Sequence, residues 1–144
     1  MNVTIATSIK QGNYKHLQNR ANRLAHFVGI WEAKLKRYID YYPDVELIIC
    51  PIKETEIAGQ ALLEANKIEI DPSYTLRQQC KTIIHELIHN EQIKQHRLEI
   101  GVKWKWNNIS YENNTASKKY TILPWEVEAK QRTKELFPNI FNKY

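Results

Sequence analysis

Five consecutive residues near the middle of the chain, His85-Glu86-Leu87-Ile88-His89, have the types and spacing of a metal site. On an α-helix, residues four positions apart lie on the same side, so the imidazoles of His85 and His89 can bind one ion. Glu86 is turned by about 100° from His85 and can reach a metal-bound water without binding the metal. The pattern predicts that His85 and His89 bind Zn²⁺ and that Glu86 is the general base.

A solvated polar stripe is the alternative interpretation of this segment. Apolar residues occupy the opposite side of the predicted helix, and its polar side also carries residues with no metal role: Gln78, Thr82, Gln92 and His96. Two observations favour the metal site. Strand-like apolar segments precede the helix, as the cleft of a zinc peptidase requires, and a candidate third ligand follows downstream.

That candidate lies just after Pro124, at the start of another predicted helix, which carries Glu126 and Glu128. A glutamate in this first turn can complete a His-His-Glu site and leave the fourth position for water. Acidic residues at a helix start also interact favourably with the helix dipole without any ligand. The two glutamates are about 200° apart on the helix, so only one can face the metal. Ala129 lies on nearly the same face as Glu126, which makes Glu126 the predicted ligand.

The pentad, the later Glu126-x-x-Ala129 and the preceding strands resemble the gluzincin zinc peptidases, particularly the small minigluzincins. Compact bacterial and phage peptidases, including the ImmA/IrrE-type proteins, carry a similar E-x-x-A helix. The resemblance covers residues 45–137. It implies a zincin-like fold, a Zn²⁺ cofactor, Glu126 as metal ligand, a peptide or protein substrate, and Ala129 as the small residue that lets two helices approach.

One position departs from that family. Its members often have Asp or Asn directly after the small residue, where the side chain orients a zinc histidine, whereas this chain has Lys130. The group that orients His85 or His89 is therefore expected elsewhere, from a backbone carbonyl, Glu128 or an Asn.

The N-terminal half is predicted to contain one long helix followed by a small sheet. Apolar residues recur at steps of three and four across residues 14–38, which predicts an amphipathic helix before Pro43. Apolar or alternating segments at residues 45–52, 57–65 and 68–71 predict a mainly antiparallel three-stranded sheet. The middle segment also has helical propensity, but a tight connection to the next strand favours the strand.

Two further helices are predicted to carry the site, which gives an α+β fold overall. Thr75 and Gln78 have the spacing of a capping box and predict a helix over residues 76–95. Pro124, favoured in a first helical turn, begins the last helix, and Pro138 is expected to end it.

Residues 99–122, between these helices, are predicted to form a loop with a possible hairpin. Its length suggests a lid or binding rim, in which Trp104 and Trp106 line the cleft. Tyr120 is the predicted catalytic donor to the oxyanion, with two alternatives, Tyr111 and His96.

Composition limits the classes of protein that the chain can form. It has 144 residues, of which 42% are hydrophobic, and a net charge of +5, so one folded domain spanning residues 1–144 is expected. No apolar stretch is long enough to cross a membrane, and residues 1–15 lack the apolar core of a secretory signal, which favours the cytoplasm. The two cysteines are expected to be buried, reduced thiols.

Charge distribution supports a second functional hypothesis. Basic residues gather in residues 10–38, and Lys103-Trp104-Lys105-Trp106 alternates bases with aromatic rings on which nucleobases can stack. The alternative to the peptidase is therefore a nucleic-acid-binding or regulatory module whose zinc site is structural or vestigial. A solvated basic helix face is the simpler explanation of the charge. The oligomeric state does not follow from the sequence.

Overall fold

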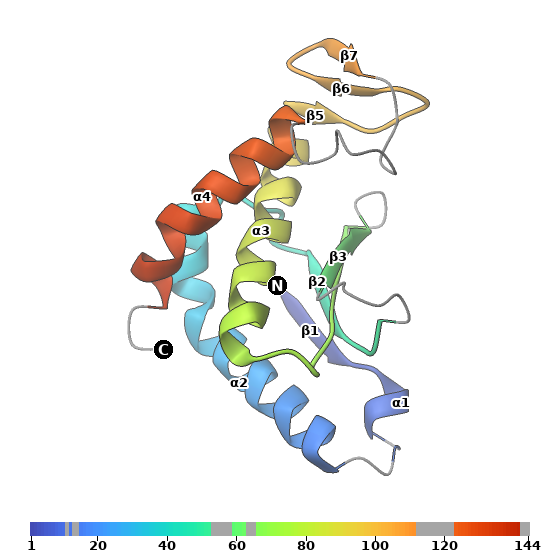
Figure 1. Ribbon diagram of the computed structural model, residues 1–144, viewed down its shortest axis with the longest axis vertical. Coiled ribbons are helices and arrows are strands. Elements are labelled where there is room, and N and C mark those ends of the chain that lie inside the picture. The colour runs from blue at the N-terminus through green and yellow to red at the C-terminus, as the bar shows by residue number, and fades with distance from the viewer. Residues whose placement is uncertain (11, 13–14, 53–58, 63–65, 112–122, 142–144) are drawn as a thin grey trace.

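The computed structural model describes residues 1–10, 12, 15–52, 59–62, 66–111 and 123–141 (Figure 1). It confirms the predicted α+β composition. The elements in chain order are β1 (Asn2–Ile5), α1 (Thr7–Lys10), α2 (Lys15–Tyr38), β2 (Glu46–Ile49), β3 (Gly59–Leu62), β4 (Lys67–Ile70), α3 (Leu76–Lys94), β5 (Leu98–Glu99), β6 (Trp104–Trp106), β7 (Ile109–Tyr111) and α4 (Pro124–Ile140).

The main sheet has four strands in the order β1-β2-β4-β3. β1, β2 and β4 are parallel, and only β3, at the edge, is antiparallel to its neighbour. The three strands predicted between residues 45 and 71 are present, but the prediction of a mainly antiparallel three-stranded sheet is wrong. β4 lies between β2 and β3, so β2 pairs with β4 and not with β3, which follows it in the sequence. β2 and β4 run in the same direction. β1, which was not predicted, supplies the fourth strand.

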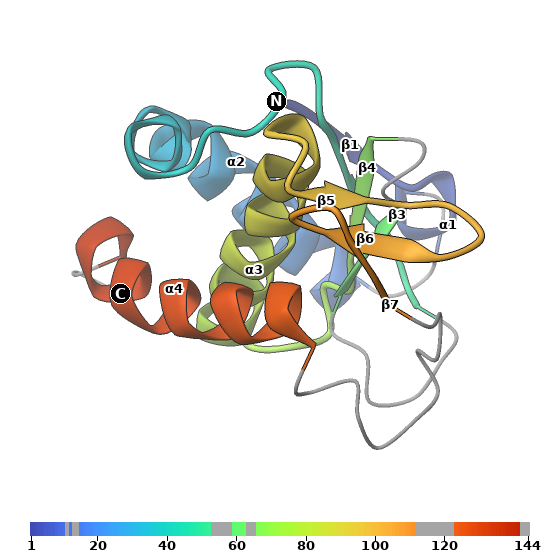
Figure 2. The same ribbon diagram turned by 90° about the horizontal axis from the view of Figure 1, so that it is seen from above.

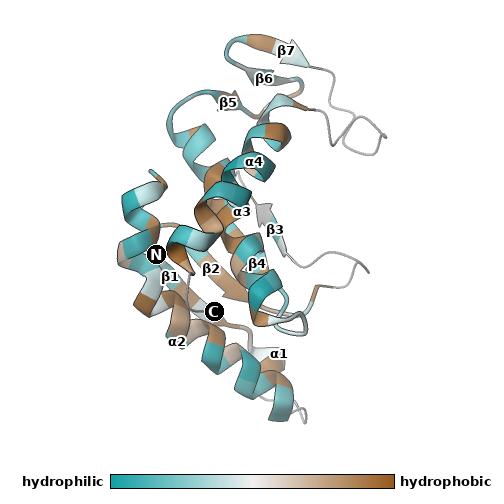
Figure 3. Cartoon of the chain, turned by 60° about the vertical axis from the view of Figure 1, so that its left-hand side comes forward, coloured by the Kyte–Doolittle hydropathy of each residue, from teal (hydrophilic) through white to brown (hydrophobic). Residues whose placement is uncertain are grey.

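The long helix α2 packs against this sheet with the predicted stripe of apolar residues. Ala21, Leu24, Val28, Trp31 and Leu35 are all buried. Tyr38, the last position of the predicted stripe, is 40% exposed because the helix ends there, and the buried Ile39 follows it. In Figure 3 β2 is mostly brown, whereas the helices alternate between brown and teal, as amphipathic helices do.

The two cysteines contribute to the same interior as free thiols. Cys80 is buried on α3 and Cys50 is half-buried after β2. Burial raises the pKa of the Cys80 thiol to about 12 and that of Cys50 to about 11, where the carboxylate of Glu69 adds to the effect.

The helices α3 and α4 run side by side in opposite directions (Figure 1). α3 begins with the predicted capping box, because Thr75 Oγ1 accepts a hydrogen bond from the backbone N–H of Gln78 and the Gln78 side chain accepts one from the N–H of Thr75. α4 begins at Pro124 as predicted but does not end before Pro138. That proline lies in the last turn, to which it contributes no backbone N–H, and Ile140 beyond it is buried.

A second, three-stranded antiparallel sheet, β5-β6-β7, lies where α3 ends and α4 begins (Figure 2). It confirms the hairpin considered possible in the predicted loop. Asn107 and Asn108 form the turn, with φ angles of 50° and 68°, a conformation that asparagine adopts readily in two-residue hairpins. Within the described residues, no helix is long and apolar enough to cross a membrane.

Candidate metal centre

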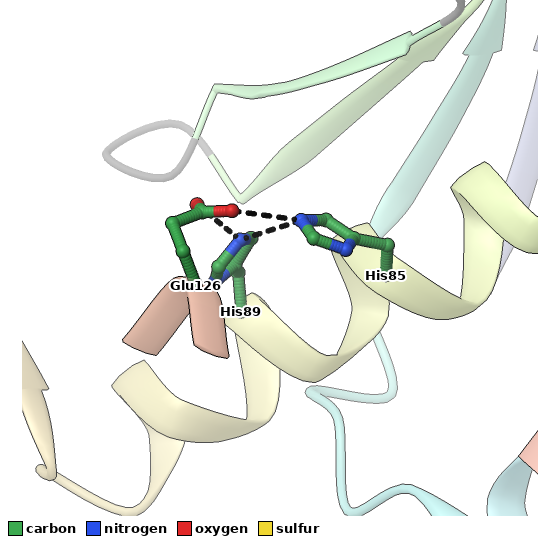
Figure 4. Close-up of side chains that lie close together, drawn as sticks. All are labelled: His85, His89 and Glu126. Atoms are coloured by element: carbon green, nitrogen blue, oxygen red, sulfur yellow. Dashed lines mark hydrogen bonds and ion pairs between the residues drawn. The ribbon is translucent and has the colours of Figure 1, made fainter. Parts of the chain in front are cut away.

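The side chains of His85, His89 and Glu126 point toward one another from α3 and α4 (Figure 4). The Nε2 atoms of the two histidines are 3.1 Å apart. The Glu126 carboxylate places Oε2 3.2 Å from His85 Nε2 and Oε1 2.9 Å from His89 Nε2. We call these three residues the donor cluster.

The spacing of the donor cluster fits one tetrahedral ion. Zinc–ligand bonds of about 2.0–2.1 Å at tetrahedral angles separate neighbouring donor atoms by about 3.3 Å. The two Nε2 atoms, 3.1 Å apart, are within a few tenths of an ångström of that value, and each lies at a similar distance, 3.2 or 2.9 Å, from a different oxygen of the Glu126 carboxylate. Two imidazoles and one carboxylate are also a known ligand set of catalytic zinc, with a fourth position open. The residues present therefore fit the metal that the sequence pattern predicts.

The members of the donor cluster differ in exposure. The side chains of His89 and Glu126 are only 6% and 3% exposed, whereas that of His85 is 21% exposed. His85 is therefore the member that is most accessible to solvent. The burial of His89 and of Gln92 also contradicts the alternative that this side of α3 is a solvated polar stripe.

The start of α4 places Glu126, and not Glu128, at the cluster. Glu126 and Ala129 share the face of α4 that packs on α3, and Ala129 is fully buried. Glu128 points elsewhere: its carboxylate accepts hydrogen bonds from Arg97 Nη1 at 2.8 and 2.6 Å. Because residues 126 and 128 are about 200° apart on α4, only one of the two carboxylates can meet the histidines.

Gln92 is the residue that orients His89, and the sequence analysis missed this role. Its amide N–H group donates to the backbone carbonyl of Trp125 at 3.1 Å and to Glu128 at 3.2 Å. Its Oε1 therefore remains as the acceptor for His89 Nδ1–H at 2.9 Å. That hydrogen bond fixes the orientation of the ring and directs Nε2 of His89 toward Glu126. The signal in the sequence was a glutamine three positions after His89, on nearly the same helix face.

Electrostatics at the cluster reflect two buried carboxyl groups beside two imidazoles. Burial is the main cause that raises the pKa of Glu86; Glu126 raises it further, and the histidines oppose the shift. For His89, burial alone would lower the pKa, but the hydrogen bond to Glu126 and the charges of Glu86 and Glu126 outweigh it and raise the pKa. Within the described residues, no hydrogen bond to the Glu86 carboxylate is found.

The other predicted site residues lie apart from the donor cluster or outside the described residues. Tyr120 falls outside the described part of the chain. Tyr111 packs edge-on against Trp125, with ring centroids 5.4 Å apart, and His96 is exposed beyond the end of α3.

Trp104 and Trp106 also pack against Trp125, at centroid distances of 5.6 and 6.5 Å. Trp125 immediately precedes Glu126, so these rings support the start of α4. They are thereby engaged with protein, which weakens the suggestion that they stack on nucleobases.

Comparisons of the chain with protein-family models, with curated proteins and with solved structures found no match. The functional argument therefore depends on the geometry of the site.

Proposed function

We propose that this protein is a zinc-dependent metallopeptidase that hydrolyses peptide bonds at the donor cluster. The observation that carries the proposal is the convergence of His85, His89 and Glu126, whose donor atoms all lie within 4.8 Å of one another. The adjacent Glu86, which is not part of that group, supplies the carboxylate that hydrolysis requires. Two histidines, one glutamate and a separate base are the complement of a zinc peptidase.

In this mechanism each residue has a defined task. A zinc ion bound at the cluster would polarise the substrate carbonyl and make water a better nucleophile near neutral pH. Glu86 accepts a proton from the attacking water and delivers it to the nitrogen of the leaving amine. Burial raises the pKa of Glu86, which favours this alternation between accepting and donating a proton. Tyr120 remains the proposed donor to the developing oxyanion.

β3 is the proposed binding strand for the substrate backbone. It is an edge strand of the main sheet and lies beside α3. Gly59 allows this close approach, because a Cβ atom there would lie 2.4 Å from Thr82 Cγ2, one turn before His85. An extended peptide can add to such an edge through backbone hydrogen bonds, which give affinity with little sequence selectivity.

Metal analysis is the first test of this function. Protein purified without added zinc, or reconstituted with it, should contain about one zinc per chain, and the His85→Ala variant should contain none. An exposed histidine on α2 provides the control, because His26→Ala should retain the metal. Wild-type protein that takes up no zinc after reconstitution contradicts the proposal.

The Glu86→Gln variant then separates binding from catalysis. It should keep its zinc and its fold but lose peptide hydrolysis by about 100- to 10,000-fold, the usual contribution of a general base. Loss of zinc in this variant would mean that Glu86 is a ligand and that the roles are assigned wrongly.

A further inference from the structure

Lys130 stands where members of the gluzincin family often have Asp or Asn. It belongs to a group of basic residues that extends away from the donor cluster. Lys81 lies one helical turn before His85 on α3, and Lys130 lies one turn after Glu126 on α4. Because the two helices are antiparallel, both lysines lie on the same side of the cluster. Arg77 and Lys134 repeat the arrangement one turn farther on. We call these four residues the basic track.

Contacts with one aromatic ring place the two bases of α3, Arg77 and Lys81, against α4. Phe137 of α4 lies under the Arg77 guanidinium, 4.8 Å from its Cζ, and 5.3 Å from Lys81 Nζ. On the helical wheel of α4, Lys130 and Lys134 are turned by only about 40° and 80° from Glu126. The basic side chains therefore border the face on which the donor cluster lies.

No acidic side chain neutralises the basic track within the described residues. All four bases are exposed, and the ion pairs found there involve other cations. The carboxylates of the neighbouring helix faces already have partners: Glu91 and Glu128 pair with arginines, and Glu135 accepts a hydrogen bond from Gln131. The track therefore presents a positive surface that is available to an external anion.

We propose that the basic track binds acidic side chains of the peptide substrate and makes the protein selective for acidic sequences. This inference rests on the proposed peptidase function. A helical turn rises about 5.4 Å, and an extended peptide advances about 3.4 Å per residue. Measured along the helix backbones, Lys81 and Lys130 are one turn, and Arg77 and Lys134 two turns, from the donor cluster. For a peptide that runs along the helices, these distances correspond to about two and about three to four residues from the scissile bond.

Peptide hydrolysis by the zinc-loaded protein tests this selectivity. Mass spectrometry of a digested peptide mixture first gives a cleaved sequence. Three versions of that peptide are then compared: one with Glu at two and four residues before the bond, one with Glu at the same distances after it, and one with Gln throughout. One Glu peptide should have a kcat/KM about tenfold above that of the Gln peptide, which is the effect that a few exposed ion pairs can supply. This difference in kcat/KM should become smaller at 0.5 M salt, because salt screens the charges.

The double variant Lys81→Gln/Lys130→Gln identifies the residues responsible. In this variant, kcat/KM for the Glu peptide should exceed that for the Gln peptide by about twofold or less. The charge-reversed variant Lys81→Glu/Lys130→Glu should instead prefer a peptide that has Lys at the positions of the two Glu residues. The control Lys15→Gln/Lys34→Gln removes the same charge from exposed positions of α2 and should leave the ratio unchanged. The inference is wrong if the wild type shows no preference, or if the preference survives in the Lys81→Gln/Lys130→Gln variant. Neither result contradicts the proposed peptidase function.

Binding distinguishes failure of this inference from failure of the proposed function. If the zinc-loaded protein hydrolyses none of the peptides, the peptidase proposal fails. Fluorescence anisotropy with labelled Glu and Gln peptides then still tests the track: tighter binding of the Glu peptide that the Lys81/Lys130 variant loses supports it. If that variant instead loses affinity for a DNA oligonucleotide and shows no peptide preference, the track serves nucleic acid and the inference is wrong.

Discussion

Two polar clusters lie where α3 and α4 meet, each around a buried glutamate, and they differ in the groups that face this glutamate. The donor cluster contains one carboxylate and two imidazoles. A neighbouring group, which we call the charge cluster, contains carboxylates matched by guanidinium groups: Glu91, Glu128, Arg97 and Arg132. The first combines a carboxylate with side chains that can bind a metal, and the second combines carboxylates with permanent positive charges.

The contacts of Glu91 show what a completed cluster looks like. Its carboxylate is buried, pairs with both Arg132 and Arg97, and accepts the backbone N–H of Asp40 at 2.8 Å. Every strong acceptor there has a donor from the protein, so the cluster joins α3, α4 and the end of α2 without any ligand. In the donor cluster, by contrast, the Glu126 carboxylate meets two imidazoles at 3.2 and 2.9 Å, a set of groups that could also bind a divalent cation.

The largest expected difference concerns zinc affinity in two variants of α4. Glu126→Ala should weaken zinc binding by far more than about 100-fold, because it removes a ligand, whereas Glu128→Ala should cost at most about 10- to 100-fold through Gln92. Competition with a chelator of known affinity measures both dissociation constants. If Glu128→Ala is the variant that empties the site, the rotation of α4 and the assignment of residues 126–129 to the E-x-x-A motif are wrong.

A smaller effect, on stability and not on metal binding, is expected at the charge cluster. Glu91→Gln should lower the free energy of unfolding by about 3 kcal/mol, the low end for removing one partner of a buried ion pair, since both arginines are partly exposed. Urea unfolding of the metal-free protein measures the change. The exposed Glu135→Gln is the matched control and should stay within about 0.5 kcal/mol.

Zinc should separate the two clusters in the same unfolding experiment. Added zinc should stabilise the wild type and Glu91→Gln by equal amounts, since the ion binds at the donor cluster in both. Zinc stabilisation that disappears in Glu91→Gln would show that the two clusters are one site, contrary to the comparison.

The sequence predicted best what depends on a single helix. His85 and His89 are four residues apart on α3, so helical geometry alone places their imidazoles together, and the capping box at Thr75 fixes where that helix begins. Glu126 lies on a different helix, and its position at the cluster followed from helical phase and from a family resemblance.

Features that depend on contacts between segments far apart in the sequence could not be predicted from local patterns. Nothing local in β2 shows that its neighbour is β4 and not β3, so the parallel arrangement was missed. β1 alternates polar and apolar residues, but its four residues are too few to stand out. The role of Gln92 depends on the backbone carbonyl of Trp125, which lies 33 positions farther along the chain.

The smallest expected effect tests whether Gln92 belongs to the donor cluster or to the charge cluster, since it contacts both His89 and Glu128. Gln92→Met keeps the length of the side chain but removes the acceptor for His89 Nδ1–H and the donor to the Trp125 carbonyl. If Gln92 fixes the orientation of His89, zinc affinity should fall by about 10- to 100-fold. The visible spectrum of the Co²⁺-substituted protein should change as well, because a rotated imidazole alters the geometry of the ligands. Gln131→Met, at an exposed position of α4, is the control and should change neither reading. A Gln92→Met variant that loses stability but keeps the wild-type zinc affinity and Co²⁺ spectrum would assign Gln92 to the charge cluster alone.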